Sequence, residues 1–317
     1  MAELSHRALR ELIEGFGGCS QYYTEMISAG ALLGGGPFEA WYIDAEPCPG
    51  KLVYQLAGGD ADQLVRAAAF LDKRECAGID INMGCAAPAI TRTGAGVRWM
   101  ADIEKAASLM AGIRKVVHKR LSVKLRIGMD DDLEYLCRFC QRLEEAGVDF
   151  ITLHPRTARE KFKRRCRWEY VARLREALKI PVGGNGDIGS AKEMLDRAKD
   201  CDAVMTGRLA VRQPWIFARA RALEQAEETA DIVFGERAAE KVTDTLLEAT
   251  GLKFLELLAQ YQPPEFYPSR ARRFFSYFCD NLKWGNYLKT LLNRENSLLG
   301  IERVWTGYFS ERREEDF

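Results

Sequence analysis

Short apolar runs alternate with longer amphipathic segments along the first two thirds of the chain. The runs have the length of buried strands, and the segments between them repeat apolar residues at helical spacing. We expect seven strands, at residues 20–26, 51–56, 79–83, 122–127, 150–154, 181–184 and 203–206. We expect helices between them, at residues 5–16, 62–73, 103–119, 131–146, 168–178 and 190–199. This alternation is typical of a parallel sheet, and the number of units favours an α/β fold of the (β/α)₈ TIM-barrel type.

One strand of the expected barrel is missing, because seven strands are visible where a closed barrel needs eight. A sheet of seven strands would leave two unpaired edges, which natural sheets avoid. We therefore expect the native frame to begin upstream of Met1 and to supply the first strand. A genuine seven-stranded open barrel is the alternative.

The last third of the chain carries no strand pattern. Helices are expected at residues 236–258, 269–282 and 284–292, with prolines between the first two. A chain of 317 residues suits one barrel of about 250 residues with an appendage. We therefore expect a barrel domain over residues 1–228 and a small helical domain over residues 229–317.

The charge is unevenly distributed along the chain. The formal net charge is zero, which by itself speaks against a nucleic-acid partner. Residues 156–175, however, contain nine basic and two acidic side chains, and residues 270–294 contain six and one. The nine cysteines show no disulfide framework and the chain does not open on an apolar segment, so a reduced, cytoplasmic protein is expected. No apolar run approaches the roughly 18 residues of a membrane span, and we expect no membrane partner.

The stretch of residues 80–100 contains the main candidate for chemistry. Its strand ends at a glycine and a cysteine, Gly84 and Cys85, where α/β enzymes present reactive side chains. Asn-x-Gly-Cys alone is a weak signal, because a cysteine after a strand is more often a small buried apolar residue. The wider spacing is more specific, and its members are Asn82, Gly84, Cys85, Ile90, Gly94, Gly96, Trp99 and Met100.

This spacing resembles the dihydrouridine synthases, flavin enzymes that reduce a uridine in transfer RNA. One position departs from the family pattern, since Ala86 replaces a proline and Pro88 follows two residues later. Two further motifs match, Val-Lys-x-Arg-x-Gly at residues 123–128 and His-x-Arg-Thr at residues 154–157. The amino-terminal residues fit the family's Ala-Pro-Met segment with Met1 as its methionine.

Polar residues are expected in a ring at the mouth of the barrel, near the carboxyl ends of the strands. The ring comprises Glu25, Gln55, Asn82, Lys124, Arg126, Thr152, His154, Asn185 and Thr206. Any one of them could be an ordinary hydrogen-bonded buried group. Lys124 is the most informative, because a lysine inside a barrel strand should lose its charge or find an anion. Glycines after the last two strands suit a phosphate, and Ser190 could cap the helix that follows the first of them.

The resemblance implies an FMN cofactor, NADPH or NADH as electron donor, and tRNA as substrate; neither DNA nor a metal ion is expected to bind, and a monomer is expected. The catalytic residue would be Cys85. The residues implied in cofactor binding are Met1, Gln55, Lys124, His154, Asn185, Gly186, Asp187, Gly207 and Arg208. The residues expected to contact the substrate are Asn82, Arg126, Arg156, Thr157, Arg272 and Arg273.

The implied reaction has two stages. The nicotinamide reduces FMN and leaves, and the reduced flavin then passes a hydride from N5 to C6 of an extruded uracil while Cys85 protonates C5. A proton donor must carry its proton, and an ordinary cysteine is mostly a thiol at neutral pH. A base in the folded RNA can leave its stack at lower cost when it lies in a loop.

Two other functions remain open on the sequence. One is another FMN barrel enzyme that acts on a free pyrimidine, and the other is an RNA-binding relative that has lost catalysis. The basic run at residues 161–167 could meet RNA or be a solvated loop. Cys137 and Cys140 lie in an expected helix without a second pair, so core packing is expected there rather than zinc.

Overall fold

The computed structural model describes residues 1–161, 163–228 and 242–315, which form two compact units. One unit is Gln21–Thr206, and the other combines Met1–Ser20 with Gly207–Phe317. The expected domain boundary after residue 228 borders residues 229–241, which lie outside the described residues, and it stays a prediction. Each unit is described by itself below.

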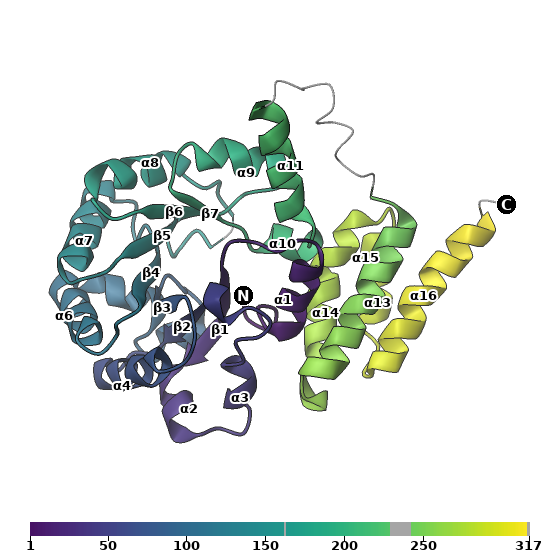
Figure 1. Cartoon of the computed structure of the whole chain (residues 1–317), viewed down its shortest axis with the longest axis horizontal. Coiled ribbons are helices and arrows are strands. Elements are labelled where there is room, and N and C mark those ends of the chain that lie inside the picture. The colour runs from purple at the N-terminus through teal and green to yellow at the C-terminus, as the bar shows by residue number, and fades with distance from the viewer. Residues whose placement is uncertain (162, 229–241, 316–317) are drawn as a thin grey trace. The chain divides into compact units, whose positions relative to one another are not determined.

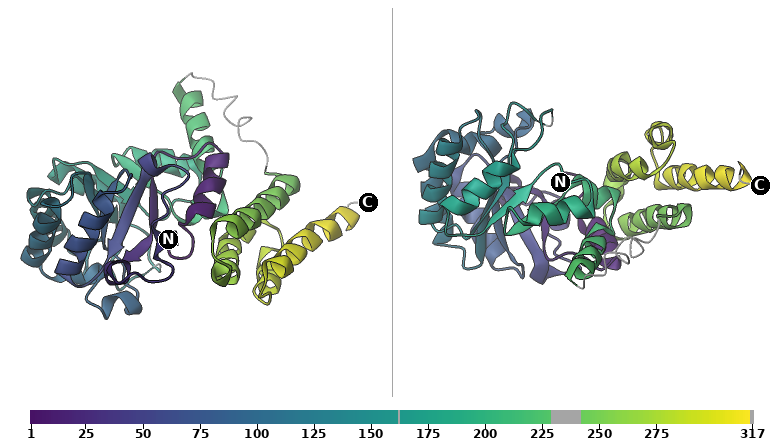
Figure 2. Two further views of the ribbon diagram at one scale, coloured as in Figure 1. Left: turned by 60° about the horizontal axis from the view of Figure 1, so that its bottom comes forward. Right: turned by 90° about the horizontal axis from the view of Figure 1, so that it is seen from above.

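The unit Gln21–Thr206 is built on one parallel sheet whose seven strands follow one another in chain order. The strands are β1 (Tyr22–Ser28), β2 (Leu52–Ala57), β3 (Gly78–Met83), β4 (Arg120–Arg126), β5 (Phe150–His154), β6 (Val182–Asn185) and β7 (Ala203–Met205). They curl into an arc with helices on its outer side (Figures 1 and 2). The prediction of a TIM-barrel-like α/β fold is therefore confirmed, with all seven expected strands in place.

Five longer helices cover the outer face of this sheet (Figure 1). They are α4 (Ala61–Asp72), α6 (Ile103–Arg114), α7 (Leu133–Glu145), α8 (Trp168–Ala177) and α9 (Ala191–Ala198). Shorter helical segments not expected from the sequence are α2 (Ala29–Gly34), α3 (Glu39–Tyr42), α5 (Pro88–Thr91), η1 (Pro49–Lys51) and η2 (Gly96–Ala101). Four of the long helices begin at an Asp or Ser side chain that accepts a hydrogen bond from the first turn. Ser190 is one of these caps, as predicted.

Burial on both faces explains why the strands read as apolar runs. Every residue of β2, β3 and β5 is buried, because one face meets the helices and the other faces the interior of the arc. Since all strands are parallel, their carboxyl ends lie along the same edge of the sheet. The polar residues near those ends are thereby collected in one region.

The second unit is helical. Its helices are α1 (Arg7–Gly15), α10 (Arg208–Arg212), α11 (Ile216–Glu228), α13 (Asp244–Tyr261), η3 (Pro264–Phe266), α14 (Tyr267–Phe278), η4 (Cys279–Asn281), α15 (Gly285–Leu292) and α16 (Leu298–Glu315). The expected helix at residues 236–258 begins at Asp244 in the described part of the chain. The long helix α16 was not predicted. His6 occupies the N-cap position of α1 and makes no side-chain capping bond.

Aromatic side chains form the core of the helical unit. Phe254 stacks on Phe274 with ring centroids 3.8 Å apart, and Phe278 and Trp305 pack around them. Arg270 is also buried, and its guanidinium donates a hydrogen bond to the side chain of Gln262. These aromatics therefore stabilise the bundle rather than face solvent. Among the described residues, no helix combines the length and the apolar character that crossing a membrane requires.

Candidate active site

Two layers of polar side chains lie inside the arc at the carboxyl end of the sheet. The strand register aligns Gln55, Asp80 and Ser122 in one layer and Asn82, Lys124 and Thr152 in the next. Residues aligned across parallel strands point to the same face of the sheet. The predicted polar ring is thus present on β2 to β5, with Asp80 and Ser122 as additional members.

A chain of hydrogen bonds connects these layers to Cys85. Ser122 Oγ donates to Asp80 Oδ1 (2.7 Å), and Gln55 Nε2 donates to Asp80 Oδ2 (2.8 Å). Asn82 Nδ2 in turn donates to Gln55 Oε1 (2.9 Å), and Asn82 Oδ1 accepts from the backbone N–H of Cys85 (2.9 Å).

An ionised carboxylate only accepts hydrogen bonds, and this property fixes which atom is the donor in every hydrogen bond of the series. Asp80 forces Gln55 to present its amide nitrogen, so Gln55 offers its oxygen to Asn82. Asn82 must then use its own nitrogen there and keep its oxygen for the N–H of Cys85. We infer that Asp80 orients the residues that hold the loop of Cys85.

The electrostatics of the interior depend on burial. Burial raises the pKa of Asp80 to about 6, and hydrogen bonds from Ser122 and Gln55 oppose that rise. Burial, followed by the charge of Arg126, lowers the pKa of Lys124 to about 8, whereas Asp80 acts in the opposite direction. Lys124 is half-buried, and its ammonium group makes no hydrogen bond or ion pair with the described residues. A cation in this position suits an anionic ligand.

The loop that carries Cys85 is held by close backbone packing. Cys85 is half-buried, and its carbonyl accepts a hydrogen bond from Val97 N (3.0 Å). Gly96 has a φ of +63°, and a Cβ built on it would lie 2.3 Å from the Cys85 carbonyl oxygen. Pro88 opens the one-turn helix α5, where its missing N–H is not needed. The shift of proline from position 86 to 88 therefore fits a local helix.

Replacing Gly96 by alanine should displace this loop. The added carbon would strain the left-handed backbone and overlap the Cys85 carbonyl, so we expect a loss of about 2 kcal/mol or more in the free energy of unfolding. Gly112→Ala, in α6, is the matched control, because its Cβ would meet only Val65 at 3.5 Å and the helix should gain about 0.5 to 1 kcal/mol. Denaturant unfolding of both variants measures this, and equal stabilities would contradict it.

Arg126 connects the reactive loop to the loop after β5. Its Nε donates to the carbonyl of Gly84 (3.1 Å), and its Nη1 donates to the carbonyls of Thr157 (3.3 Å) and Lys161 (3.2 Å). Arg126 and Thr157 are both buried. These contacts position the two loops relative to each other, and the expected substrate contacts of both residues stay predictions.

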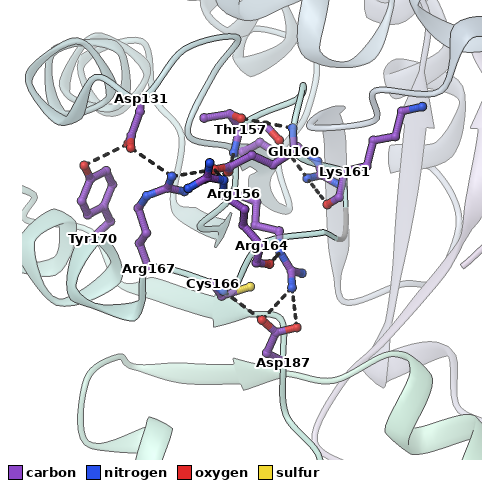
Figure 3. A network of polar contacts seen from close by, with 11 residues as sticks. Asp131, Arg156, Thr157, Glu160, Lys161, Arg164, Cys166, Arg167, Tyr170 and Asp187 are labelled. Atoms are coloured by element: carbon purple, nitrogen blue, oxygen red, sulfur yellow. Dashed lines mark hydrogen bonds and ion pairs between the residues drawn. The ribbon is translucent and has the colours of Figure 1, made fainter.

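Arg156 lies at the centre of a second network (Figure 3). Its Nη2 is 2.6 Å from both carboxylate oxygens of Asp187, and its Nη1 is 3.2 Å from His154 Nε2. An arginine can only donate, so Nε2 accepts and the ring proton lies on Nδ1. Burial would raise the pKa of Asp187, but the hydrogen bond from Cys166 N and the Arg156 guanidinium lower it overall. The predicted roles of Arg156 and Asp187 as ligand contacts stay predictions.

The loop after β6 packs directly on this network. Asn185 donates a hydrogen bond to the carbonyl of Met205 (2.7 Å), which joins β6 to β7. Gly186 has a φ of +120°, and a Cβ there would lie 2.5 Å from the sulfur of Cys166 and 2.8 Å from the ring of His154. Only glycine fits this position, because a larger side chain would overlap Cys166 and His154.

Five predicted site residues belong to the other unit. Met1 lies beside Gly207, and Arg208 is the first residue of α10. Arg272 donates to the carbonyl of Glu295, and Arg273 is exposed. Their expected roles toward FMN and RNA stay predictions.

Two of the three residues that the sequence analysis missed share one signal. Asp80 and Ser122 stand two positions before the predicted Asn82 and Lys124, on the same face of their strands. Extending the polar ring one layer deeper would have found both. Cys166 had no such signal, because it comes from a loop. Burial and the neighbouring Asp187 raise the pKa of its thiol to about 12.

The parallel sheet, with a thiol and a half-buried ammonium group at its carboxyl edge, defines a TIM-barrel-like protein with an enzyme-type site. A family model described as "Dihydrouridine synthase (Dus)" matches residues 1–278. The chain belongs to the dihydrouridine synthase family.

Named relatives agree with this assignment. The chain is 31% identical over 229 residues to a probable tRNA-dihydrouridine synthase of Aquifex aeolicus, covering 68% of this chain and 69% of the relative. It is 27% identical over 291 residues to probable tRNA-dihydrouridine synthase 1 of Synechocystis, covering 91% and 79%. A solved aldolase variant of Sulfolobus solfataricus has a TM-score of 0.48 at 10% identity, covering 85% of this chain and 86% of that structure.

Proposed function

We propose that this protein reduces a uridine of tRNA to 5,6-dihydrouridine, with FMN as cofactor and NADPH or NADH as electron donor. The observation that carries the proposal is that Cys85 and Lys124 lie at the same carboxyl edge of the sheet, in a chain of this family. Cys85 lies two residues after the end of β3, and Lys124 is on the neighbouring strand β4, in register with Asn82.

The residues at this edge fit a flavin. The unpaired ammonium group of Lys124 suits the N1 and O2 edge of an isoalloxazine, where negative charge develops on reduction. Gln55 and His154 lie on the same inner face of the sheet and are both buried. When bound, FMN would supply the hydride for uracil C6.

The chain's own residues would complete the reaction. The Cys85 thiol donates the proton to C5, since proton donation requires a group that carries its proton at the working pH. Asn82 holds the loop through the Cys85 N–H, and we expect it to contact the uracil. The base must leave its stack to reach this interior, and tRNA loops offer bases at low unstacking cost.

Lys124→Met should weaken flavin binding. Loss of a charge-assisted contact of about 1.5 kcal/mol or more corresponds to at least about tenfold weaker binding. Because the ammonium form predominates below pH 8, the affinity of the wild type should also fall as the pH rises through about 8. Titration of FMN into flavin-free protein, followed by fluorescence, measures both effects.

Lys179→Met is the control for that titration. Lys179 is exposed, and its side chain makes no hydrogen bond or ion pair with the described residues. We expect wild-type affinity and wild-type pH dependence from it. Equal losses in the two lysine variants would remove Lys124 from the cofactor site.

The proposed function is tested with purified protein, FMN, NADPH and an unmodified tRNA transcript. Mass spectrometry of digested RNA should show a uridine that has gained two hydrogens. Failure to form dihydrouridine with either nicotinamide, in protein that binds FMN, would overturn the proposal. Turnover of free uridine would favour the pyrimidine enzyme, and RNA binding without flavin binding would favour a relative that has lost catalysis.

A further inference from the structure

Ion pairs to neighbouring loops hold both ends of the loop between β5 and α8 (Figure 3). At its start, Arg156 is paired with Asp187. At its end, Arg167 is paired with Glu160 (2.6 Å) and with Asp131 (3.0 Å). Hydrogen bonds from Arg167 and Thr157 lower the pKa of Glu160 to about 2, so this carboxylate stays ionised and the pairing persists over the working pH range.

The acidic side chains at this loop are paired, whereas several of its basic side chains are exposed. The acidic side chains around it are engaged by arginines, and Asp130 likewise pairs with Arg159 (2.9 Å). Three exposed cations remain, Lys161, Lys163 and Arg165. None of their side chains makes a hydrogen bond or an ion pair with any residue that the structure describes. We call these three residues the basic triad.

The basic triad is anchored close to the reactive thiol. Lys161 has a φ of +52°, and its carbonyl accepts a hydrogen bond from Arg126 Nη1. The same guanidinium holds the carbonyl of Gly84, the residue before Cys85. One side chain thus sets the distance between the triad and the loop of Cys85.

A loop that merely needs solubility does not require this arrangement. Three like charges within five residues repel one another, and a free loop would spread them apart. Here ion pairs and backbone hydrogen bonds keep the loop in one place while its unpaired cations face solvent. Such cations neutralise RNA phosphates and release counterions on binding.

We propose that the basic triad is a phosphate-contacting surface for the RNA substrate, which holds the nucleotide chain beside Cys85. The proposal rests on the proposed function for the identity of its partner. The triad contacts the backbone and not the bases, so it contributes affinity and register without selecting a sequence.

The test is the salt dependence of tRNA binding by the full chain. The triad variant is Lys161→Asn, Lys163→Gln and Arg165→Gln, in which asparagine tolerates the left-handed backbone at position 161. Each lost phosphate contact removes about 0.7 to 0.9 from the slope of log K against log salt. We expect a slope smaller by about 2 to 3 and binding weaker by at least about tenfold at low salt.

The matched control removes three exposed cations from the opposite end of the barrel unit, Lys73→Gln, Arg74→Gln and Lys115→Gln. These residues lie at the carboxyl ends of α4 and α6, helices that run back toward the start of the strands, and their side chains make no hydrogen bond or ion pair with the described residues. The control should keep the wild-type slope and affinity. FMN binding and thermal unfolding should match the wild type in both triple variants.

The outcomes separate the two proposals. If the wild type forms dihydrouridine but the triad variant binds tRNA with an unchanged slope, the triad proposal is overturned and the proposed function stands. Equal losses in the control variant would also overturn it, because the effect would then come from net charge. If the wild type binds tRNA through the triad and forms no dihydrouridine, the proposed function fails and the surface remains. Absence of tRNA binding would overturn both.

Discussion

Cys85→Ala should abolish dihydrouridine formation while the protein still binds flavin. A positioned proton donor contributes about 10² to 10⁴ in rate, so we expect product formation to fall by roughly 10³-fold. The alanine keeps the backbone N–H that bonds to Asn82 and the carbonyl that bonds to Val97. The loop should therefore persist, and tRNA affinity should stay within about twofold of the wild type. Mass spectrometry of tRNA under single-turnover conditions measures the loss.

Cys166→Ala is the control for this variant. Cys166 is a second half-buried thiol in the same region, close to Gly186. Its backbone N–H, which bonds to Asp187, is unaffected by the change. We expect product formation within a few-fold of the wild type. Similar losses in both cysteine variants would contradict a specific proton-donating role for Cys85.

Asp80→Asn should make the protein more stable and less active. The carboxyl holds its proton up to about pH 6 in the folded state and up to about pH 4 when unfolded. The contribution of this carboxyl to the free energy of unfolding is therefore fully present below pH 4 and is lost as the pH rises through 6. The loss amounts to about 3 kcal/mol. An asparagine is never ionised. The stability difference between variant and wild type should grow from near zero at pH 4 to about 2 to 3 kcal/mol at pH 7.5.

The activity of Asp80→Asn, in contrast to its stability, should fall. An amide can either donate or accept, so Asn at position 80 no longer fixes the orientation of Gln55 and Asn82. If the two amides turned over, Asn82 would no longer offer an acceptor to the Cys85 N–H. We expect product formation to fall about tenfold, which corresponds to a barrier higher by about 1.4 kcal/mol. Urea unfolding at several pH values and single-turnover assays measure the two effects.

Ser122→Ala provides the comparison for Asp80→Asn. It removes one hydrogen bond to the carboxylate and leaves the direction of the chain unchanged. We expect a less stable protein at neutral pH with activity close to the wild type. If Asp80→Asn kept full activity, the orienting role of Asp80 would be wrong.

The strands and their order could be predicted because burial on both faces leaves a strong apolar signal. The observed β5 matches its predicted bounds, and the other six strands differ by at most two residues at either end. The same regularity placed Gln55, Asn82 and Lys124 on one interior surface. A residue's position on a parallel strand determines which face it shares with its neighbours.

The partners of the arginines could not be predicted, because they depend on loops that are distant in sequence. Arg156 and Asp187 are 31 residues apart and meet only when the loops after β5 and β6 pack together. Arg126 donates to three backbone carbonyls from two different loops, and none of these partners could be read from the sequence. The helix α16 was missed for a related reason, since its apolar face is defined by packing on α13, α14 and α15.

The composition of the helical unit has a consequence for synthesis on the ribosome. Helix α1 packs on α13, which begins at Asp244, whereas residues 21–206 form their own unit in between. At about 5 to 20 residues per second, α1 would wait roughly 10 to 50 seconds for its partner to be translated. The nascent barrel unit can therefore fold first, and during that interval the apolar face of α1 is a natural target for chaperones.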